Sequence, residues 1–182
     1  MEITKSFLSH PKILIAALNG PAVGLSAALI AHCDFIYATP STYLLTPFTS
    51  LGLVAEGGSS YTFVRRLGLA KANEALILSK PLHAADLLAC GFLNKIYPAP
   101  EDPQDCSGFH KAVLEDVRRE FLDRGLNRDS MLLVKKLIKG AWEEKLESIN
   151  VKEVFMGVER FLSGAPIKEF GGVVRGEKKH KL

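Results

Sequence analysis

The chain has 182 residues, of which 47% are apolar and 24% charged, a balance typical of one soluble globular domain and not of a disordered or membrane protein. The formal net charge is only +3, and much of the positive charge lies in the last eight residues, whereas a nucleic-acid binder should show a basic stripe across its folded body. Three widely spaced cysteines without a CxxC pair argue against a disulfide framework and against a zinc site.

The first half of the chain predicts strands that alternate with short helices. Residues 13–18 form a continuous apolar run with β-branched residues, which suits a strand buried on both faces. After the break at Asn19-Gly20-Pro21, residues 25–31 are rich in good helix formers and predict a buried helix. We expect further strands over 33–38, 42–45 and 93–97, and further helices over 59–67, 71–78 and 84–90, with Gly68 and Gly91 as stops.

A break and a helical region follow the last predicted strand. Residues 98–107 contain three prolines and three acidic residues, so we place a boundary there. The expected division is a β/α core over 1–98, a linker over 99–108 and a helical region over 109–182. Apolar residues at helical spacing predict helices over 110–124, 132–142 and 145–163. Strands followed by helices indicate a mixed α/β body with a helical appendix.

A glycine-containing turn, residues 19–24, connects the first predicted strand to the buried helix. Free backbone N–H groups at a helix start, together with the helix dipole, can hold an anion or a developing oxyanion. The alternative is a plain strand-to-helix turn whose glycines permit close packing. The turn lacks the GxGxxG spacing of dinucleotide-binding loops and the lysine of a P-loop.

Glu56 is the one acidic residue between Thr39 and Arg65. Apolar neighbours on its N-terminal side should desolvate the carboxylate and raise its pKa toward values useful for proton transfer. The start of the following helix acts in the opposite direction, so the sequence leaves the net shift open. A surface or helix-capping glutamate is the alternative interpretation.

Two segments resemble the signature of the crotonase (enoyl-CoA hydratase/isomerase) superfamily, namely PKILIAALNGPAVGLSAALIAHCDFIYAT and YLLTPFTSLGLVAEGGSS. The Gly-Leu-Ser version of the turn is similar to that of the fungal peroxisomal Δ3,Δ2-enoyl-CoA isomerases. The resemblance covers nearly all of the chain. It implies an α/β, crotonase-like (ClpP/crotonase) β-spiral of ββα units, incomplete at the N-terminus, with a C-terminal helical trimerisation region.

The resemblance also implies roles for individual residues. The N–H of Leu25, just after Gly24, would be one of two donors to the thioester oxygen of an acyl-CoA. Glu56 would remove a proton from C2 of a 3-enoyl-CoA and return one at C4, giving the trans-2-enoyl-CoA. Contacts with the substrate are expected from Gly24, Ala22, Phe48, Leu51 and Leu53, the last three around an apolar acyl pocket. Core packing is the alternative for each of these three.

The positions at which hydratases of this family have two glutamates are Ala28 and Phe48 here. Neither residue can act as an acid or a base, which favours the isomerase over the hydratase. Two alternatives stay open. The first is another acyl-CoA enzyme of the family, a hydratase or a dienoyl-CoA isomerase. The second is a catalytically weak fragment that only assembles with full-length subunits.

The remaining expectations concern partners and location. The resemblance implies no cofactor apart from the CoA of the substrate, and it implies assembly into a homotrimer or hexamer. From the composition we expect no nucleic-acid partner and no membrane span. The tripeptide His180-Lys181-Leu182 resembles the Ser-Lys-Leu address, which implies an import receptor and the peroxisomal matrix. Family members have roughly 80 to 100 residues before the first quoted segment, so we expect weak or no activity of this piece alone. We further expect His32 to be packed or hydrogen-bonded, and Asp34 to cap or pair locally.

Overall fold

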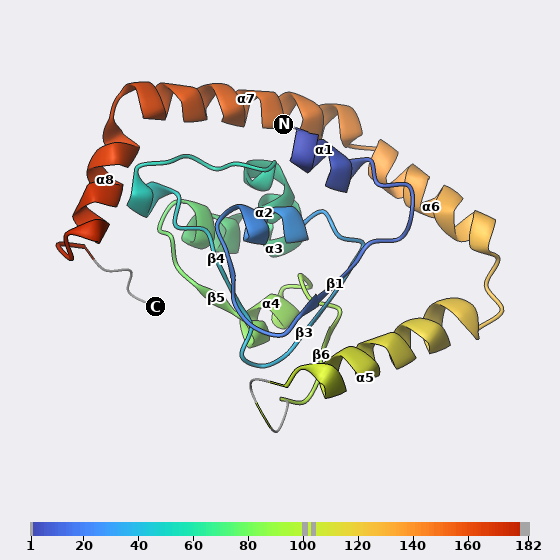
Figure 1. The fold of residues 1–182 in the computed structure, drawn as a ribbon. Helices are drawn as coiled ribbons and strands as arrows, with labels where there is room; N and C mark the ends of the chain where they lie inside the picture. The colour runs from blue at the N-terminus through green and yellow to red at the C-terminus, as the bar shows by residue number, and fades with distance from the viewer. Residues whose placement is uncertain (1, 100–101, 103–104, 179–182) are drawn as a thin grey trace.

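The computed structural model describes residues 2–99, 102 and 105–178 (Figure 1). Two small sheets and their covering helices form the body, and the C-terminal helices run around its outside. Residues 100, 101, 103 and 104 of the predicted linker and the tripeptide His180-Lys181-Leu182 lie outside the described residues.

The first sheet is parallel and has the order β1-β3-β6, from β1 (Ile15–Leu18), β3 (Phe35–Ala38) and β6 (Lys95–Ile96). Its register pairs Ile15 with Phe35 and Leu18 with Ala38. The predicted apolar runs are therefore strands, each shorter than the run itself. Ile36 and Ala38 of the central strand are completely buried, as expected of a parallel sheet with covered faces.

The second sheet has the order β2-β4-β5, from β2 (Ala22–Val23), β4 (Tyr43–Leu45) and β5 (Leu82–His83). Strand β2 runs parallel to β4, and β5 runs antiparallel to it. The two-residue strands β2 and β5 were not predicted, because each directly follows a proline, which indicates a break, whereas the equally short β6 lies within a predicted strand.

Helices cover these sheets and close the main core. They are α1 (Glu2–Leu8), α2 (Leu25–Ile30), α3 (Ser59–Leu76) and α4 (Ala84–Ala89), with a 3₁₀ turn η1 (Thr49–Leu51). Gly68 has φ 75° and ψ 160°, so it interrupts α3 where a helix stop was predicted. Phe63 of α3 and Leu87 of α4 are completely buried and meet Ile36 in the main hydrophobic cluster.

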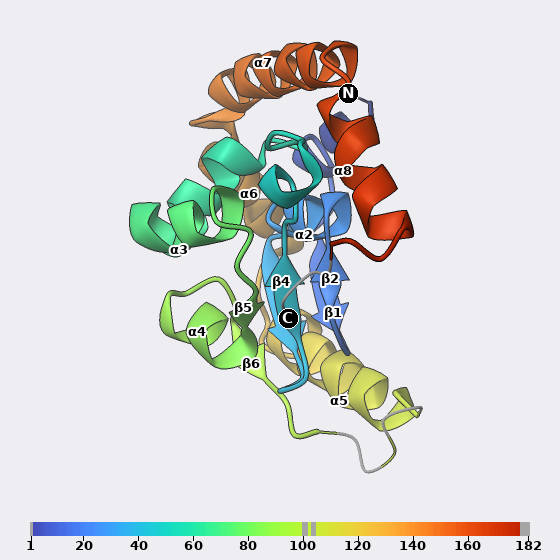
Figure 2. The same cartoon turned by 90° about the vertical axis from the view of Figure 1, so that its left-hand side faces the viewer.

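The C-terminal helices follow the outside of the body (Figures 1 and 2). They are α5 (Ser107–Val117), which continues into a π-helical turn η2 (Arg118–Leu122), then α6 (Arg128–Gly140), α7 (Glu143–Leu162) and α8 (Ala165–Val174). Three of them were predicted with shifted ends, whereas α8 was not predicted. None of the described helices has the length and apolar character needed to cross a membrane.

Apolar side chains of these helices divide into packed and exposed sets. Phe109 and Val113 of α5 pack on Tyr37 and Tyr97, so this face is used within the chain. In contrast, α6, α7 and α8 expose many large apolar side chains, among them Leu133, Leu137, Phe155, Phe161, Leu162, Ile167 and Val174. Within α6, Lys135 alone is buried. Helix α6 is therefore not attached to the body by an ordinary apolar face.

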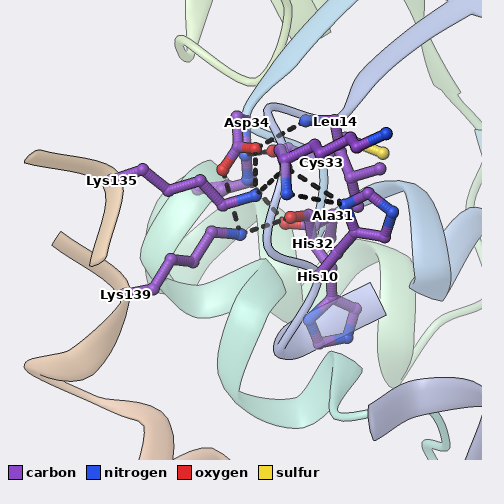
Figure 3. A network of polar contacts seen from close by, with 10 residues as sticks. His10, Leu14, Ala31, His32, Cys33, Asp34, Lys135 and Lys139 are labelled. Carbon is purple, nitrogen blue, oxygen red and sulfur yellow. Dashed lines mark hydrogen bonds and ion pairs between the residues drawn. The ribbon is translucent and has the colours of Figure 1, made fainter. Parts of the chain in front are cut away.

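A buried ionic network attaches α6 instead (Figure 3). Asp34, at the start of β3, lies 2.7 Å from the Nζ of Lys135 and 3.5 Å from the Nζ of Lys139, and it accepts a 2.7 Å hydrogen bond from the N–H of Leu14. The side chains of the three charged residues are only 9–15% exposed. The expectation that Asp34 caps or pairs locally is thus wrong, because its ionic partners are about 100 residues away and sequence proximity cannot indicate them.

The same network covers the backbone carbonyls between α2 and β3. Lys139 donates to the carbonyl of His32, and Arg66 of α3 donates to the carbonyls of Ala31, at 2.8 Å, and of Cys33. These carbonyls belong to the C-cap of α2 and to the turn that leads into β3. Cations from two distant helices therefore satisfy the acceptors of this connection.

Candidate active site

The turn at Gly24 has the geometry that the sequence predicts for a strand-to-helix connection. Gly24 is the N-cap of α2 with φ 66° and ψ −133°, a conformation that favours glycine, and its N–H donates to the carbonyl of Leu45 at 2.8 Å. Leu25 is the first residue of α2, so its N–H has no acceptor within the helix.

The loop before α3 packs directly on this turn. A Cβ added to Gly57 would lie 3.0 Å from Cδ1 of Leu25 and 3.1 Å from Cβ of Ala28. Glu56 immediately precedes this contact. The structure therefore places Gly57, the residue after Glu56, against the side chain of Leu25 on α2.

His32 fixes this loop from the end of α2. Its ring is 2% exposed, and its Nε2–H donates to the carbonyl of Gly57 at 2.7 Å. Burial lowers the pKa of His32, and the nearby Lys139 and Arg66 act in the same direction, which outweighs the opposing hydrogen bond. The ring is therefore neutral near pH 7, and the predicted packed or hydrogen-bonded role is confirmed.

Glu153 of α7 completes the site, and sequence reasoning missed it. Gly58 is the N-cap of α3 and has no side chain to cap the helix. The Glu153 carboxylate instead accepts hydrogen bonds from the N–H of Gly58 at 2.6 Å, from the N–H of Ser60 at 2.9 Å and from Oγ of Ser60 at 2.6 Å. A glycine pair where a capping residue is usual was the available signal, but it does not identify the distant acceptor.

Gly58 has a left-handed conformation, φ 76°, and a Cβ there would lie 2.8 Å from Cδ1 of Leu146. We expect Gly58→Ala to lower the free energy of unfolding by roughly 2–3 kcal/mol, about 1 from backbone strain and the rest from the close contact. Gly91→Ala is the matched control, because Gly91 has φ 80° and no atom within 4 Å of the added Cβ. Urea denaturation of both variants measures the difference, and equal losses would show that the close contact has no effect.

Glu56 is exposed, yet its carboxylate is partly desolvated by the surrounding protein. Burial raises its pKa, and the negative charge of Glu153 raises it further. The sequence left the direction of the Glu56 pKa shift open, and in the structure the pKa is raised. A carboxylate with a raised pKa is a better proton acceptor and can also release the proton again.

The predicted substrate contacts differ in how accessible they are. Phe48 is 2% exposed and belongs to the protein interior, and Ala22 is 7% exposed. Leu51, at the end of η1, and Leu53, just after it, are partly buried. Ala28 is completely buried. Ala28 and Phe48, which the resemblance matches to the hydratase glutamates, are therefore both buried and carry no ionisable group.

A cavity of about 920 Å³ lies elsewhere, between β3 and the helices α5 and α6. Its lining includes Phe35, Tyr37, Val134 and Ile138, and neither Leu25 nor Glu56 lines it. Among the described residues, no group of three or more His, Cys, Asp or Glu side chains is placed to hold a metal ion. The cavity and the predicted catalytic residues are thus separate features.

Comparison with known proteins gives a consistent result. The profile of the family described as enoyl-CoA hydratase/isomerase matches residues 2–107. The chain is 51% identical over 183 residues to a Delta(3,5)-Delta(2,4)-dienoyl-CoA isomerase of Pyricularia oryzae and 35% identical over 181 residues to a 3,2-trans-enoyl-CoA isomerase of Saccharomyces cerevisiae. The two alignments span 100% and 99% of this chain. They span only 65% of the Pyricularia oryzae relative and 63% of the Saccharomyces cerevisiae relative, so the chain is shorter than either.

Among solved structures, an enoyl-CoA hydratase/isomerase from Pseudoalteromonas atlantica T6c superimposes with a TM-score of 0.83 at 24% identity. The match covers 98% of this chain and 68% of that one. At this identity the likeness concerns the fold alone. The crotonase-like α/β fold that the sequence predicts is confirmed.

Proposed function

Because the chain belongs to the enoyl-CoA hydratase/isomerase family, we propose that it forms part of an enoyl-CoA isomerase that converts 3-enoyl-CoA into trans-2-enoyl-CoA in fatty-acid β-oxidation. The observation on which this rests is the single carboxylate of Glu56, with its raised pKa, beside the Gly24–Leu25 turn. The buried Ala28 and Phe48 support an isomerase over a hydratase, because they provide no second acid or base.

In the proposed reaction Glu56 removes a proton from C2 of the substrate. The resulting dienolate places negative charge on the thioester oxygen, and the N–H of Leu25 stabilises it as one of two donors. Protonated Glu56 then delivers a proton to C4. One carboxylate suffices because removal and delivery occur on the same face. The raised pKa supports both steps, since the group must gain a proton and lose it again.

The proposal extends to the surroundings of the reacting atoms. Gly24 and Ala22 would border the thioester, and Phe48, Leu51 and Leu53 would shape the acyl pocket, Phe48 from the interior. No cofactor is needed apart from the CoA of the substrate. The exposed apolar side chains of α6 to α8 support assembly into a trimer or hexamer, and the terminal tripeptide suggests import into the peroxisome.

A second candidate is the dienoyl-CoA isomerase reaction, which the name of the relative from Pyricularia oryzae favours. Converting a 3,5-dienoyl-CoA into a 2,4-dienoyl-CoA moves a proton from C2 to C6, whereas the first reaction moves it from C2 to C4. A single carboxylate can reach both C2 and C4 more easily than it can reach both C2 and C6. Glu56 acting alone therefore favours the 3-enoyl substrate.

Incubation of the purified chain with trans-3-hexenoyl-CoA, and in parallel with a 3,5-dienoyl-CoA, tests the proposal. We expect trans-2-hexenoyl-CoA at a low rate, no 3-hydroxyacyl-CoA, and slower conversion of the dienoyl substrate. Product analysis by liquid chromatography and mass spectrometry separates the three outcomes. Formation of the hydroxyacyl product, faster turnover of the dienoyl substrate, or no conversion above that of Glu56→Gln would each refute the assignment for this chain.

A further inference from the structure

The backbone of residues 56–60 is fixed by hydrogen bonds to other groups. The carbonyl of Glu56 accepts from the N–H of Ser59 at 3.2 Å, and the carbonyl of Gly57 accepts from His32. The N–H groups of Gly58 and Ser60 donate to Glu153. The side chain of Glu56 is exposed, whereas the loop behind it is fixed. Such an arrangement orients a reacting group without enclosing it.

Of the groups that hold this loop, Glu153 is the most distant in the sequence, and it is the one that carries a charge. It lies on α7, is 6% exposed, and its two carboxylate oxygens receive three hydrogen bonds of 2.6–2.9 Å. It therefore takes the place of an N-cap side chain that Gly58 cannot provide, and its charge is favourable at a helix N-terminus. With both oxygens engaged, Glu153 is not itself placed to act as the base.

We propose that Glu153 is a positioning residue for Glu56: its carboxylate fixes the start of α3 and with it the loop that presents the catalytic side chain. This inference rests on the proposed function, in which Glu56 is the base. Glu153 also acts on Glu56 through its charge, which adds to the effect of burial in raising the pKa. Removing that charge should therefore lower the pKa of Glu56.

The other charged or titratable groups around the loop do not replace Glu153. His32, from the end of α2, has a lowered pKa and is neutral near pH 7, although Lys139 and Arg66 lie close enough to influence it. Arg160 of α7 donates to the carbonyl of Gly52, at the far end of the loop, at 3.0 Å. Glu153 is the charged group that raises the pKa of Glu56.

The primary test is the titration of Glu56 in the full chain. Glutamate carboxyl carbons labelled with carbon-13 are followed by NMR, and Glu56→Gln identifies the signal of Glu56. We expect Glu153→Gln to lower the pKa of Glu56. Glu147→Gln, the same change on the same helix at an exposed residue that pairs with Lys5 at 3.9 Å, should leave it unchanged. An equal pKa in both variants would overturn the proposal.

The kinetic test separates positioning from general destabilisation. We expect Glu153→Gln to lower kcat by about 10- to 100-fold with little change in KM, because a displaced base affects the proton transfer more than binding. The acidic limb of the pH profile should move to lower pH, a shift that a purely structural role would not produce. A wild-type kcat together with an unshifted limb would contradict the inference.

Glu153→Asp is the second variant and keeps the test decisive if Glu153→Gln does not fold, which circular dichroism checks. Aspartate retains the charge but is shorter by one methylene. It should keep the pKa of Glu56 close to that of the wild type and lower kcat less than glutamine does. A wild-type kcat in Glu153→Asp would show that the reach of the carboxylate is unimportant.

The two proposals can fail separately. If the wild type and Glu147→Gln both lack turnover, the proposed function fails for this chain, and the NMR titration still decides whether Glu153 acts on Glu56. If turnover is present and depends on Glu56 but is unaffected by Glu153→Gln, the proposed function stands and the positioning role is wrong.

Discussion

Glu56→Gln should lower kcat for 3-enoyl-CoA by about 100- to 10,000-fold, the range that a single general acid–base group contributes. Glutamine has nearly the same shape but cannot accept the proton from C2. The KM should change little, since the side chain transfers a proton and is not needed to hold the CoA. Initial rates with 3-hexenoyl-CoA measure the effect, and Glu115→Gln, at an exposed glutamate of α5, is the control. A loss of less than about tenfold would exclude Glu56 as the base.

The same variant also separates chemistry from folding. The pKa of Glu56 is raised above its ordinary value of 4.5, so the ionised carboxylate is disfavoured in the folded state once the pH exceeds that value. Glutamine removes this unfavourable charge. At neutral pH we therefore expect Glu56→Gln to be at least as stable as the wild type in urea, although it is inactive. In the wild type, kcat/KM should fall as the pH is lowered through the raised pKa.

The sequence was informative where the chemistry is local. The glycine turn, Leu25 and Glu56 could be found because each lies in a short segment with a distinctive pattern, and the structure places Leu25 next to Gly57. The direction of the pKa shift could not be predicted, because burial and the helix dipole oppose each other. Burial decides the direction, and the charge of Glu153, which is 97 positions further along the chain than Glu56 and is brought back by α7, adds to it.

The fold shows the same limit. Long apolar runs predicted β1, β3 and the main helices, since burial leaves a periodic or continuous pattern in the sequence. The two-residue strands β2 and β5 directly follow prolines, which indicate breaks, and they were missed. The attachment of α6 was also missed, because its only buried residue is a lysine, and a lysine in an amphipathic helix is usually interpreted as a surface residue.

Asp34→Asn should lower the free energy of unfolding by about 3–5 kcal/mol, the usual effect of removing one partner from a buried ionic network. Lys135 and Lys139, with side chains 9% and 15% exposed, would then lack their counter-charge. Burial already lowers the pKa of Lys139, and Asp34 opposes this effect. Asparagine can still accept from the N–H of Leu14, so the loss reports mainly the charge.

Asp123→Asn is the matched control, because Asp123 pairs with Arg118 at 3.6 Å with both side chains more than half exposed. This exposed pair should contribute less than about 1 kcal/mol. A double-mutant cycle with Lys139→Met adds a second check: the double variant should be more stable than the sum of the single losses implies, by about 1 kcal/mol or more. Additive losses, or equal losses in Asp34→Asn and Asp123→Asn, would show that the network does not stabilise the fold.

Trp142 allows the position of the weakened contact to be identified. It is the one tryptophan of the chain, lies between α6 and α7, and its ring is 4.0 Å from the guanidinium of Arg65. If the network is what attaches α6, Trp142 fluorescence in Asp34→Asn should change at lower urea concentration than the circular dichroism of the whole chain. Coincident transitions would mean that α6 unfolds only with the body, and that the ionic contacts stabilise the fold as a single cooperative unit.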